Sequence, residues 1–192
     1  SGLMPSAEWK RRERHQAWFP GETLIVGIGQ GFTLTTPLQL ASATATLSMR
    51  GQRMRPSILH ATQDTTETEQ ILDEPERLKS VVLKDPENWH SVIHSMTRVL
   101  HGPRGTARRS GAGAKFKIAG KTGTAQVFGI AQDAEYEEDE IDERLRDHSL
   151  FVAFAPAEDP EIAIAVIAEN AGSGSATAAP IARKLLDYYL LR

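Results

Sequence analysis

Three stretches of the chain carry apolar residues at helical spacing, and each follows a recognisable start signal. Residues 36–51 begin with Thr36 as an N-cap and Pro37 at the first helical position, and Gly51 is expected to end this helix. Residues 85–102 begin with the pair Asp85-Pro86 and end at Gly102. A further helix is predicted from Pro180 to the end of the chain, and a shorter charged one over residues 6–14. The apolar stripe of the second stretch consists of Trp89, Val92, Ile93, Met96, Val99 and Leu100.

Strand patterns gather in the second half of the chain. Residues 149–156 and 161–170 are short apolar runs separated by the turn AEDP, so we expect them to be antiparallel neighbours. Residues 116–128 predict a glycine-interrupted strand, and residues 55–64 are a weaker candidate. The order of these elements predicts an α+β fold, an antiparallel sheet flanked by helices.

Two charged stretches are interpreted as loops. Residues 101–115 are rich in glycine and basic, and residues 129–147 are long and acidic. The basic residues from Arg104 to Lys117 could hold an anionic glycan or a partner, and the acidic run from Glu135 to Glu143 could bind a cation. Solvated loop surfaces are the simpler interpretation of both.

Composition excludes several function classes. The chain has 192 residues, 40% of them hydrophobic, which suffices for one domain with a core. A net charge of -3 gives no overall attraction to nucleic acid, and no apolar run reaches membrane-spanning length. The absence of cysteine excludes disulfides, thiol catalysis and cysteine-ligated zinc. The opening SGLMPSAEWKRRER lacks an initiator methionine, so we expect a piece of a longer protein.

The stretch IAGKTGTAQVFG raises the question of nucleotide binding. A phosphate-binding loop of the form G-x-x-x-x-G-K-[ST] needs glycine five positions before Gly120, where Lys115 stands, and it must open a helix. The residues that follow are typical of a strand instead. The alternative is a Lys-Thr-Gly strand edge that pairs with a peptide and binds its terminal carboxylate.

Several ordered blocks support that alternative. GLMPSAEWK, GIGQGFTLTTPLQLASATATLSMRG, IAGKTGTAQVFG and DHSLFVAFAPAEDPEIAIAVIAENAG together resemble the class B penicillin-binding proteins, most closely the elongation transpeptidases of Gram-negative bacteria. The resemblance covers essentially the whole chain. It implies the serine β-lactamase/penicillin-binding transpeptidase fold. It also implies a peptidoglycan D,D-transpeptidase that crosslinks stem peptides through a serine acyl-enzyme and is acylated by β-lactams.

The chain departs from that family in one respect. The family holds its nucleophile in S-x-x-K, but no serine here has lysine three positions later; Lys10 and Lys84 lie four positions after Ser6 and Ser80. The S-x-N motif is also missing. We therefore expect residues 1–192 to be the C-terminal portion of one transpeptidase domain, inactive alone because the nucleophile lies upstream.

The resemblance assigns roles to four consecutive residues. Lys121 would supply positive charge near the substrate carboxylate, which the hydroxyls of Thr122 and Thr124 would bind. Gly123 would allow close backbone approach, and the Thr124 amide would be one of two oxyanion donors. No metal and no cofactor is expected.

The resemblance also implies partners and a location. The ligands would be a D-Ala-D-Ala stem peptide and β-lactams, and the protein partner a lipid-linked glycan polymerase of the elongation machinery. The parent would lie on the periplasmic side of the bacterial inner membrane, held by an N-terminal anchor outside these residues. No nucleic-acid partner is expected.

Two other classes stay open. One is a hydrolase of the same fold, either a β-lactamase or a D,D-carboxypeptidase, which product analysis separates from a transpeptidase. The other is a non-catalytic sensor or scaffold, which would lack an intact S-x-x-K upstream.

Other motifs have weaker functional interpretations. GIGQG lacks the G-x-G-x-x-G spacing of dinucleotide sites, and by resemblance it lines the back of the active site, so a structural role is expected. His90, His94 and His101 lie near one another on a helical wheel, where a solvated helix face explains them better than a metal site. For His148 a capping or hydrogen-bonding role is expected.

Overall fold

Two of the predicted helix start signals act where the sequence places them, whereas the helix predicted to start at Pro180 begins earlier, at Ala178. The Thr36 hydroxyl accepts a hydrogen bond from the Gln39 amide at 3.2 Å, and the Gln39 side chain accepts one from the Thr36 amide at 2.9 Å. This reciprocal cap begins α3, Pro37–Ser48. The helix ends before Gly51, whose φ of 95° is unfavourable for a residue with a side chain. The Asp85 carboxylate likewise accepts a hydrogen bond from the Glu87 amide, at the start of α4, Glu87–His101.

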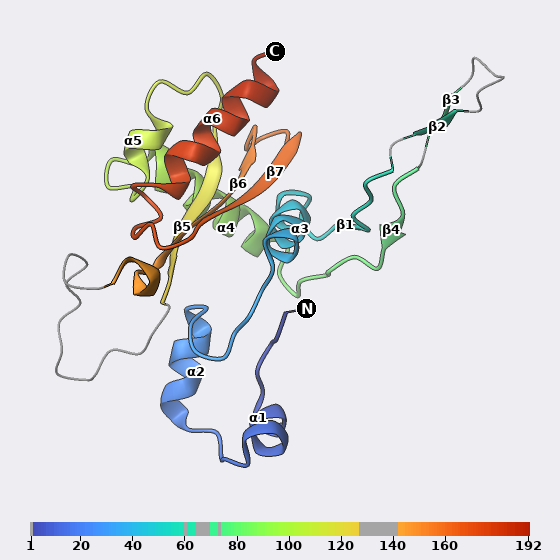
Figure 1. The fold of residues 1–192 in the computed structure, drawn as a ribbon. Coiled ribbons are helices and arrows are strands. Elements are labelled where there is room, and N and C mark those ends of the chain that lie inside the picture. The colour runs from blue at the N-terminus through green and yellow to red at the C-terminus, as the bar shows by residue number, and fades with distance from the viewer. Residues whose placement is uncertain (1, 60, 64–69, 73, 127–141) are drawn as a thin grey trace.

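The computed structural model describes residues 2–59, 61–63, 70–72, 74–126 and 142–192 (Figure 1). The helices are α1 Ala7–Arg14, α2 Pro20–Gly27, α3 Pro37–Ser48, α4 Glu87–His101, α5 Arg108–Gly111, the 3-10 turn η2 Glu143–Leu145 and α6 Ala178–Leu190. The strands are β1 Arg53–Met54, β2 Ala61–Gln63, β3 Gln70–Leu72, β4 Arg77–Leu78, β5 Ala119–Ala125, β6 His148–Ala155 and β7 Ile162–Ala168. Among the residues so described, no helix is both long and apolar enough to span a bilayer.

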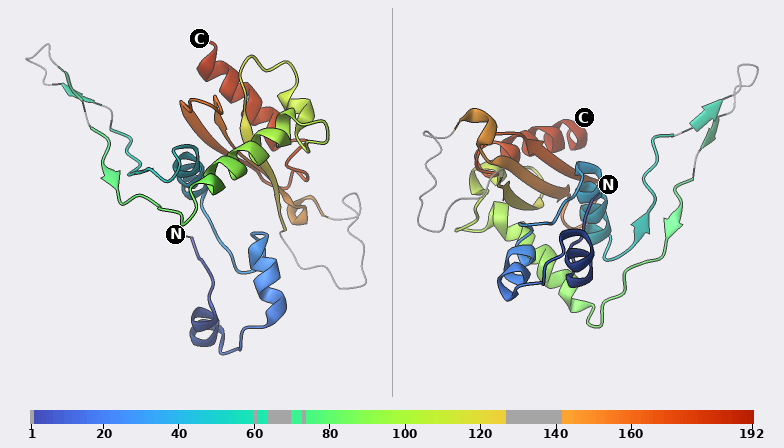
Figure 2. Two further views of the ribbon diagram at one scale, coloured as in Figure 1. Left: turned by 180° about the vertical axis from the view of Figure 1, so that it is seen from behind. Right: turned by 60° about the horizontal axis from the view of Figure 1, so that its bottom comes forward.

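The main sheet is antiparallel and has the order β5-β6-β7. The turn at residues 157–160 joins β6 to β7, so that Ala155 lies opposite Ile162. α6 covers one face of this sheet, and α3 and α4 lie on the other (Figures 1 and 2). The predicted α+β class, an antiparallel sheet flanked by helices, is therefore confirmed.

Alternation along β6 divides the core between the two faces. Phe151 and Ala153 pack with Leu186 and with the fully buried alanines near the start of α6. Phe154 points to the opposite face and packs with Ile93 of α4 and Leu47 of α3. The small alanines allow α6 to lie close to the sheet, which fixes the position of the segment that precedes it.

Two parts extend from this core. The first comprises α1 and α2, where the Lys10 ammonium, only 2% exposed, lies 2.5 Å from a Glu22 oxygen and above the Phe19 ring. The hydrogen bond from Lys10 and a second from the Phe19 amide lower the pKa of Glu22. The second is a two-strand arm in which β1 pairs with β4 and β2 with β3, and it projects away from the sheet (Figure 2).

Several features differ from the sequence predictions. The helix α2 was not predicted, and the basic stretch is not a loop throughout, because it contains α5. Residues 55–64 contribute only the short β2 within the described chain, paired in the unpredicted arm. Val92, expected in the apolar stripe, is 43% exposed, whereas Ile93 and Leu100 are buried. Most of the acidic stretch lies outside the described residues.

Candidate active site

The Lys-Thr-Gly residues lie on a strand with one open edge. β5 pairs with β6 so that Thr122 lies opposite Phe151 and Thr124 opposite Ser149. Within the described parts of the chain, no strand pairs with the other edge of β5. This edge of β5 is therefore open to an extended peptide, although two of its outward carbonyls, those of Thr122 and Thr124, already accept hydrogen bonds from side chains.

Lys121 lies beside a cavity of positive character. Its exposed side chain lines a cavity of about 320 Å³ with Arg98 and Arg104, and no acidic residue lines this cavity among the described residues. Its ammonium also donates a hydrogen bond to the Thr122 carbonyl at 2.6 Å, which holds it along the strand edge. This arrangement favours a bound anion such as a carboxylate.

Thr122 is joined by a threonine that the sequence did not single out. The hydroxyls of Thr106 and Thr122 lie 3.4 Å apart, and Thr106 lines the same cavity as Lys121. Gly105 makes this position possible, because a Cβ there would lie 2.3 Å from the Val99 carbonyl oxygen. The only sequence signal for Thr106 is its place in the glycine-rich basic stretch.

Thr124 is fixed by a residue from the GIGQG segment. The Gln30 side-chain amide donates a hydrogen bond to the Thr124 carbonyl at 2.7 Å. In an antiparallel ladder the N–H and C=O of one residue point to the same side, so the Thr124 amide also faces the open edge. The role of the Thr124 amide as an oxyanion donor stays a prediction.

Gly123 lies under a tightly packed backbone segment. A Cβ on Gly174 would lie 2.3 Å from the Leu150 carbonyl oxygen and 2.4 Å from that of Gly123. A Cβ on Gly123 itself would lie 3.1 Å from the Leu150 Cβ. The backbone at Gly174 thus packs directly on the β5–β6 pair at Gly123. The predicted role of Gly123, to let a substrate approach the backbone closely, stays a prediction.

Ser149 connects this segment to α6. Its hydroxyl is fully buried, donates to the Ser173 carbonyl at 2.9 Å and accepts from the Ala178 amide at 3.0 Å. One buried side chain therefore holds the start of α6 against the strand that pairs with Thr124.

The histidine predictions are partly wrong. His101 is not on a solvated face, because its Nε2 atom accepts a hydrogen bond from the Ile118 amide at 2.9 Å. Burial lowers the pKa of His101, and repulsion from Lys117 and Arg183 lowers it further, against a smaller opposing effect of Glu158. A neutral His101 therefore connects α4 to the start of β5.

The remaining histidines have separate positions. His90 and His94 are exposed, and their rings stack with centroids 6.4 Å apart. In the part of the chain that the structure describes, no three His, Asp or Glu side chains could hold a metal ion together. His148 accepts a hydrogen bond from the Asn170 amide at 3.0 Å, which confirms its hydrogen-bonding role.

Comparison with known proteins gives consistent matches. Residues 6–187 match the family described as the penicillin binding protein transpeptidase domain. The chain is 44% identical over 190 residues to the peptidoglycan D,D-transpeptidase MrdA of Acinetobacter baumannii, a match that covers 99% of this chain but only 27% of that protein.

Two solved structures have similar folds. The structure of Pseudomonas aeruginosa PBP2 in complex with WCK 5153 has 46% sequence identity and a TM-score of 0.76, covering 100% of this chain and 38% of that one. A complex of Helicobacter pylori PBP2 with MreC has 27% identity and a TM-score of 0.70, covering 98% of this chain and 31% of that one.

Proposed function

Since the chain belongs to the penicillin-binding protein transpeptidase family, we propose that it forms the Lys-Thr-Gly side of the active site of a peptidoglycan D,D-transpeptidase. The predicted resemblance to class B penicillin-binding proteins, and to penicillin-binding protein 2 in particular, is confirmed. The observation that supports the proposal is the open β5 edge, where Lys121 lies beside a cation-lined cavity.

The open edge of β5 suits the end of a stem peptide. An extended D-Ala-D-Ala terminus adds to this edge as a further strand, through backbone hydrogen bonds. Its carboxylate is held by Lys121 and by the hydroxyls of Thr122 and Thr124. Thr106, within 3.4 Å of the Thr122 hydroxyl, adds a further donor at the same place.

The reaction consists of two acyl transfers. A serine hydroxyl from outside these residues attacks the carbonyl carbon of the terminal peptide bond, and the carbonyl oxygen becomes an oxyanion that accepts a hydrogen bond from the Thr124 amide. The C–N bond then breaks and the terminal D-Ala leaves as an amine, having taken up a proton. An amine of a second stem peptide attacks the resulting ester, forms the crosslink and releases the serine.

Penicillin reacts at the same site. A β-lactam imitates the D-Ala-D-Ala end, and the serine opens its ring to form a stable ester. The carboxylate of the antibiotic then takes the place of the peptide carboxylate beside Lys121 and Thr122.

The full-length protein is proposed to act on the periplasmic side of the inner membrane, with a lipid-linked glycan polymerase as partner. Helicobacter pylori PBP2, a similar protein, is solved in complex with another protein, MreC, which supports assembly with a protein partner in general. The membrane anchor would lie outside residues 1–192.

Fluorescent-penicillin labelling of the full-length protein, followed by peptide mass mapping, tests this function. An adduct on a serine outside these 192 residues is expected, and an adduct within them would overturn the division of the site. No adduct would favour a non-catalytic module. Incubation with stem peptides then separates the enzymes, because a transpeptidase yields crosslinked peptide and a carboxypeptidase yields free acid.

A further inference from the structure

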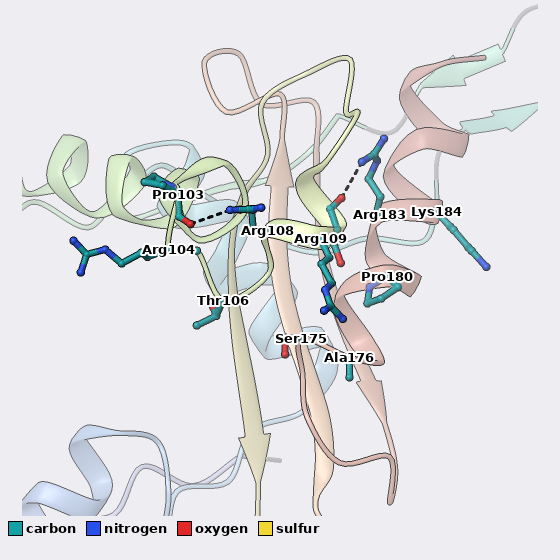
Figure 3. A pocket seen from close by; sticks show the side chains of 12 residues that line it. Pro103, Arg104, Thr106, Arg108, Arg109, Ser175, Ala176, Pro180, Arg183 and Lys184 are labelled. Atoms are coloured by element: carbon teal, nitrogen blue, oxygen red, sulfur yellow. Dashed lines mark hydrogen bonds between the residues drawn. The ribbon is translucent and has the colours of Figure 1, made fainter.

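A second cavity lies beside the Lys121 cavity. It has a volume of about 840 Å³ and lies between the α4–α5 loop, α5 and the start of α6 (Figure 3). Residues 103–106 line both cavities, so that one short segment separates them. A ligand of peptide size seated against Thr122 could therefore extend around this segment.

The walls of this cavity are strongly basic. Its lining includes five cationic residues, and no acidic residue lines it among those described. Only Arg183 has an ion pair there, with both oxygens of Asp187 at 2.9 Å. The other four, with no ion pair among the described residues, are Arg104, Arg108, Arg109 and Lys184.

The cavity walls are held in place before any ligand binds. The Arg183 guanidinium donates to the Ser110 carbonyl at 2.8 Å and to the Ala112 carbonyl at 2.9 Å, which fixes α5 against α6. Arg108 donates to the Pro103 carbonyl at 3.2 Å, a contact drawn in Figure 3. Arg109 extends toward Ser175, which also lines the cavity.

One buried polar group in the lining lacks a partner. Ser110 is 7% exposed, and its hydroxyl makes no hydrogen bond to any described residue. A buried hydroxyl without a partner is costly, and this one lies behind the cavity surface rather than on it. Guanidinium groups bind carboxylates strongly, through charge-assisted and often bidentate hydrogen bonds.

We propose that this basic cavity is a second anion subsite, which binds a carboxylate of the stem peptide other than the terminal one. The inference rests on the proposed function and extends it, because it makes the enzyme selective for acidic donor peptides. Arg109 supplies the charge, with Ser175 as a neutral donor. The terminal carboxylate stays with Lys121 and Thr122 in the smaller cavity.

A pair of synthetic peptides tests the subsite. Both end in D-Ala-D-Ala; one carries two further carboxylates and the other carries amides in their place. In the full-length protein, Arg109→Gln should lower kcat/KM for the acidic peptide about tenfold, the value of one charge-assisted hydrogen bond, and leave the amide peptide unchanged. The exposed Arg77 of the distant arm provides the matched control, and Arg77→Gln should change neither value.

Labelling by fluorescent penicillin separates the two proposals. If Arg109→Gln is labelled at the wild-type rate but loses the discrimination between acidic and amide peptide, the subsite is supported. Equal kcat/KM values for the two peptides in the wild type, or an equal loss for both in Arg109→Gln, would overturn it. Failure of penicillin to label even the wild type would overturn the proposed function instead.

Discussion

The Gln30 side chain donates a hydrogen bond to the Thr124 carbonyl at 2.7 Å, joining residues 94 positions apart. Gln30 follows Gly29 and precedes Gly31, which have φ values of 80° and 70°. These two left-handed positions turn the chain so that the glutamine reaches the end of β5. The GIGQG segment is therefore structural, as predicted, and its structural role is to hold the backbone of Thr124, the residue whose N–H is the proposed oxyanion donor.

Replacement of this glutamine should slow acylation without unfolding the protein. Gln30→Ala removes the hydrogen bond to Thr124, and we expect the rate of penicillin acylation to fall about tenfold, the value of one such bond. The measurement is the acylation rate of the full-length protein with fluorescent penicillin. Gln16→Ala changes an exposed glutamine and should keep the wild-type rate. An unchanged rate in Gln30→Ala would contradict the proposed positioning role.

Loss of the Lys121 charge should affect chemistry far more than stability. The side chain is exposed, so Lys121→Ala should change the free energy of unfolding by less than about 0.5 kcal/mol. The acylation rate should fall by about 10²- to 10³-fold, as for the loss of one transition-state donor. Lys115→Ala, at a lysine before the same strand, is the control. Equal rates in the two variants would remove Lys121 from the site.

A methyl group on Gly174 should destabilise the sheet next to Gly123. Gly174→Ala places a Cβ 2.3 Å from the Leu150 carbonyl oxygen, and backbone atoms cannot move aside as a flexible side chain does. We expect a loss of about 1–3 kcal/mol in the free energy of unfolding, measured by urea titration. Gly21→Ala in α2 is the control, since no atom lies within 4 Å of its added Cβ. If Gly174→Ala were as stable as the Gly21→Ala control, the backbone around Gly174 would have to shift freely, which would contradict the tight packing.

Stability should fall as the pH falls, partly because of His101. Its pKa is lowered in the folded protein from the ordinary value of 6.5, so the unfolded chain binds the proton first. The stabilisation from His101 is therefore complete above pH 6.5, and it is lost as the pH falls from 6.5 through the lowered pKa of the folded protein. Urea titrations at about pH 7.5 and about pH 5.5 measure the difference.

A glutamine at this position separates the hydrogen bond from the charge. His101→Gln can still accept from the Ile118 amide but does not titrate, so its pH dependence should be smaller than that of the wild type. His90→Gln changes an exposed histidine of the same helix and is the matched control. The attribution to His101 fails if both variants keep the wild-type difference between the two pH values.

The amino-acid sequence alone was enough to predict α1, α3, α4 and α6 and the three strands of the main sheet, among them the Lys-Thr-Gly strand. The reason is that these signals are local. The Thr36–Gln39 cap lies within one helical turn, and the apolar runs of β6 and β7 are joined by a short turn. The family resemblance added the roles of Lys121 and Thr124, which stay predictions.

Which distant residues share the site depends instead on the tertiary structure. Thr106, Gln30 and Gly174 come from three separate segments, and their contacts with β5 depend on how helices and loops close over the sheet. Neither helical period nor composition encodes such contacts, because the separation along the chain is too large for a local signal. His101 shows the same limit: its place on the helical wheel gave no sign that β5 would lie where the Ile118 amide could donate to it.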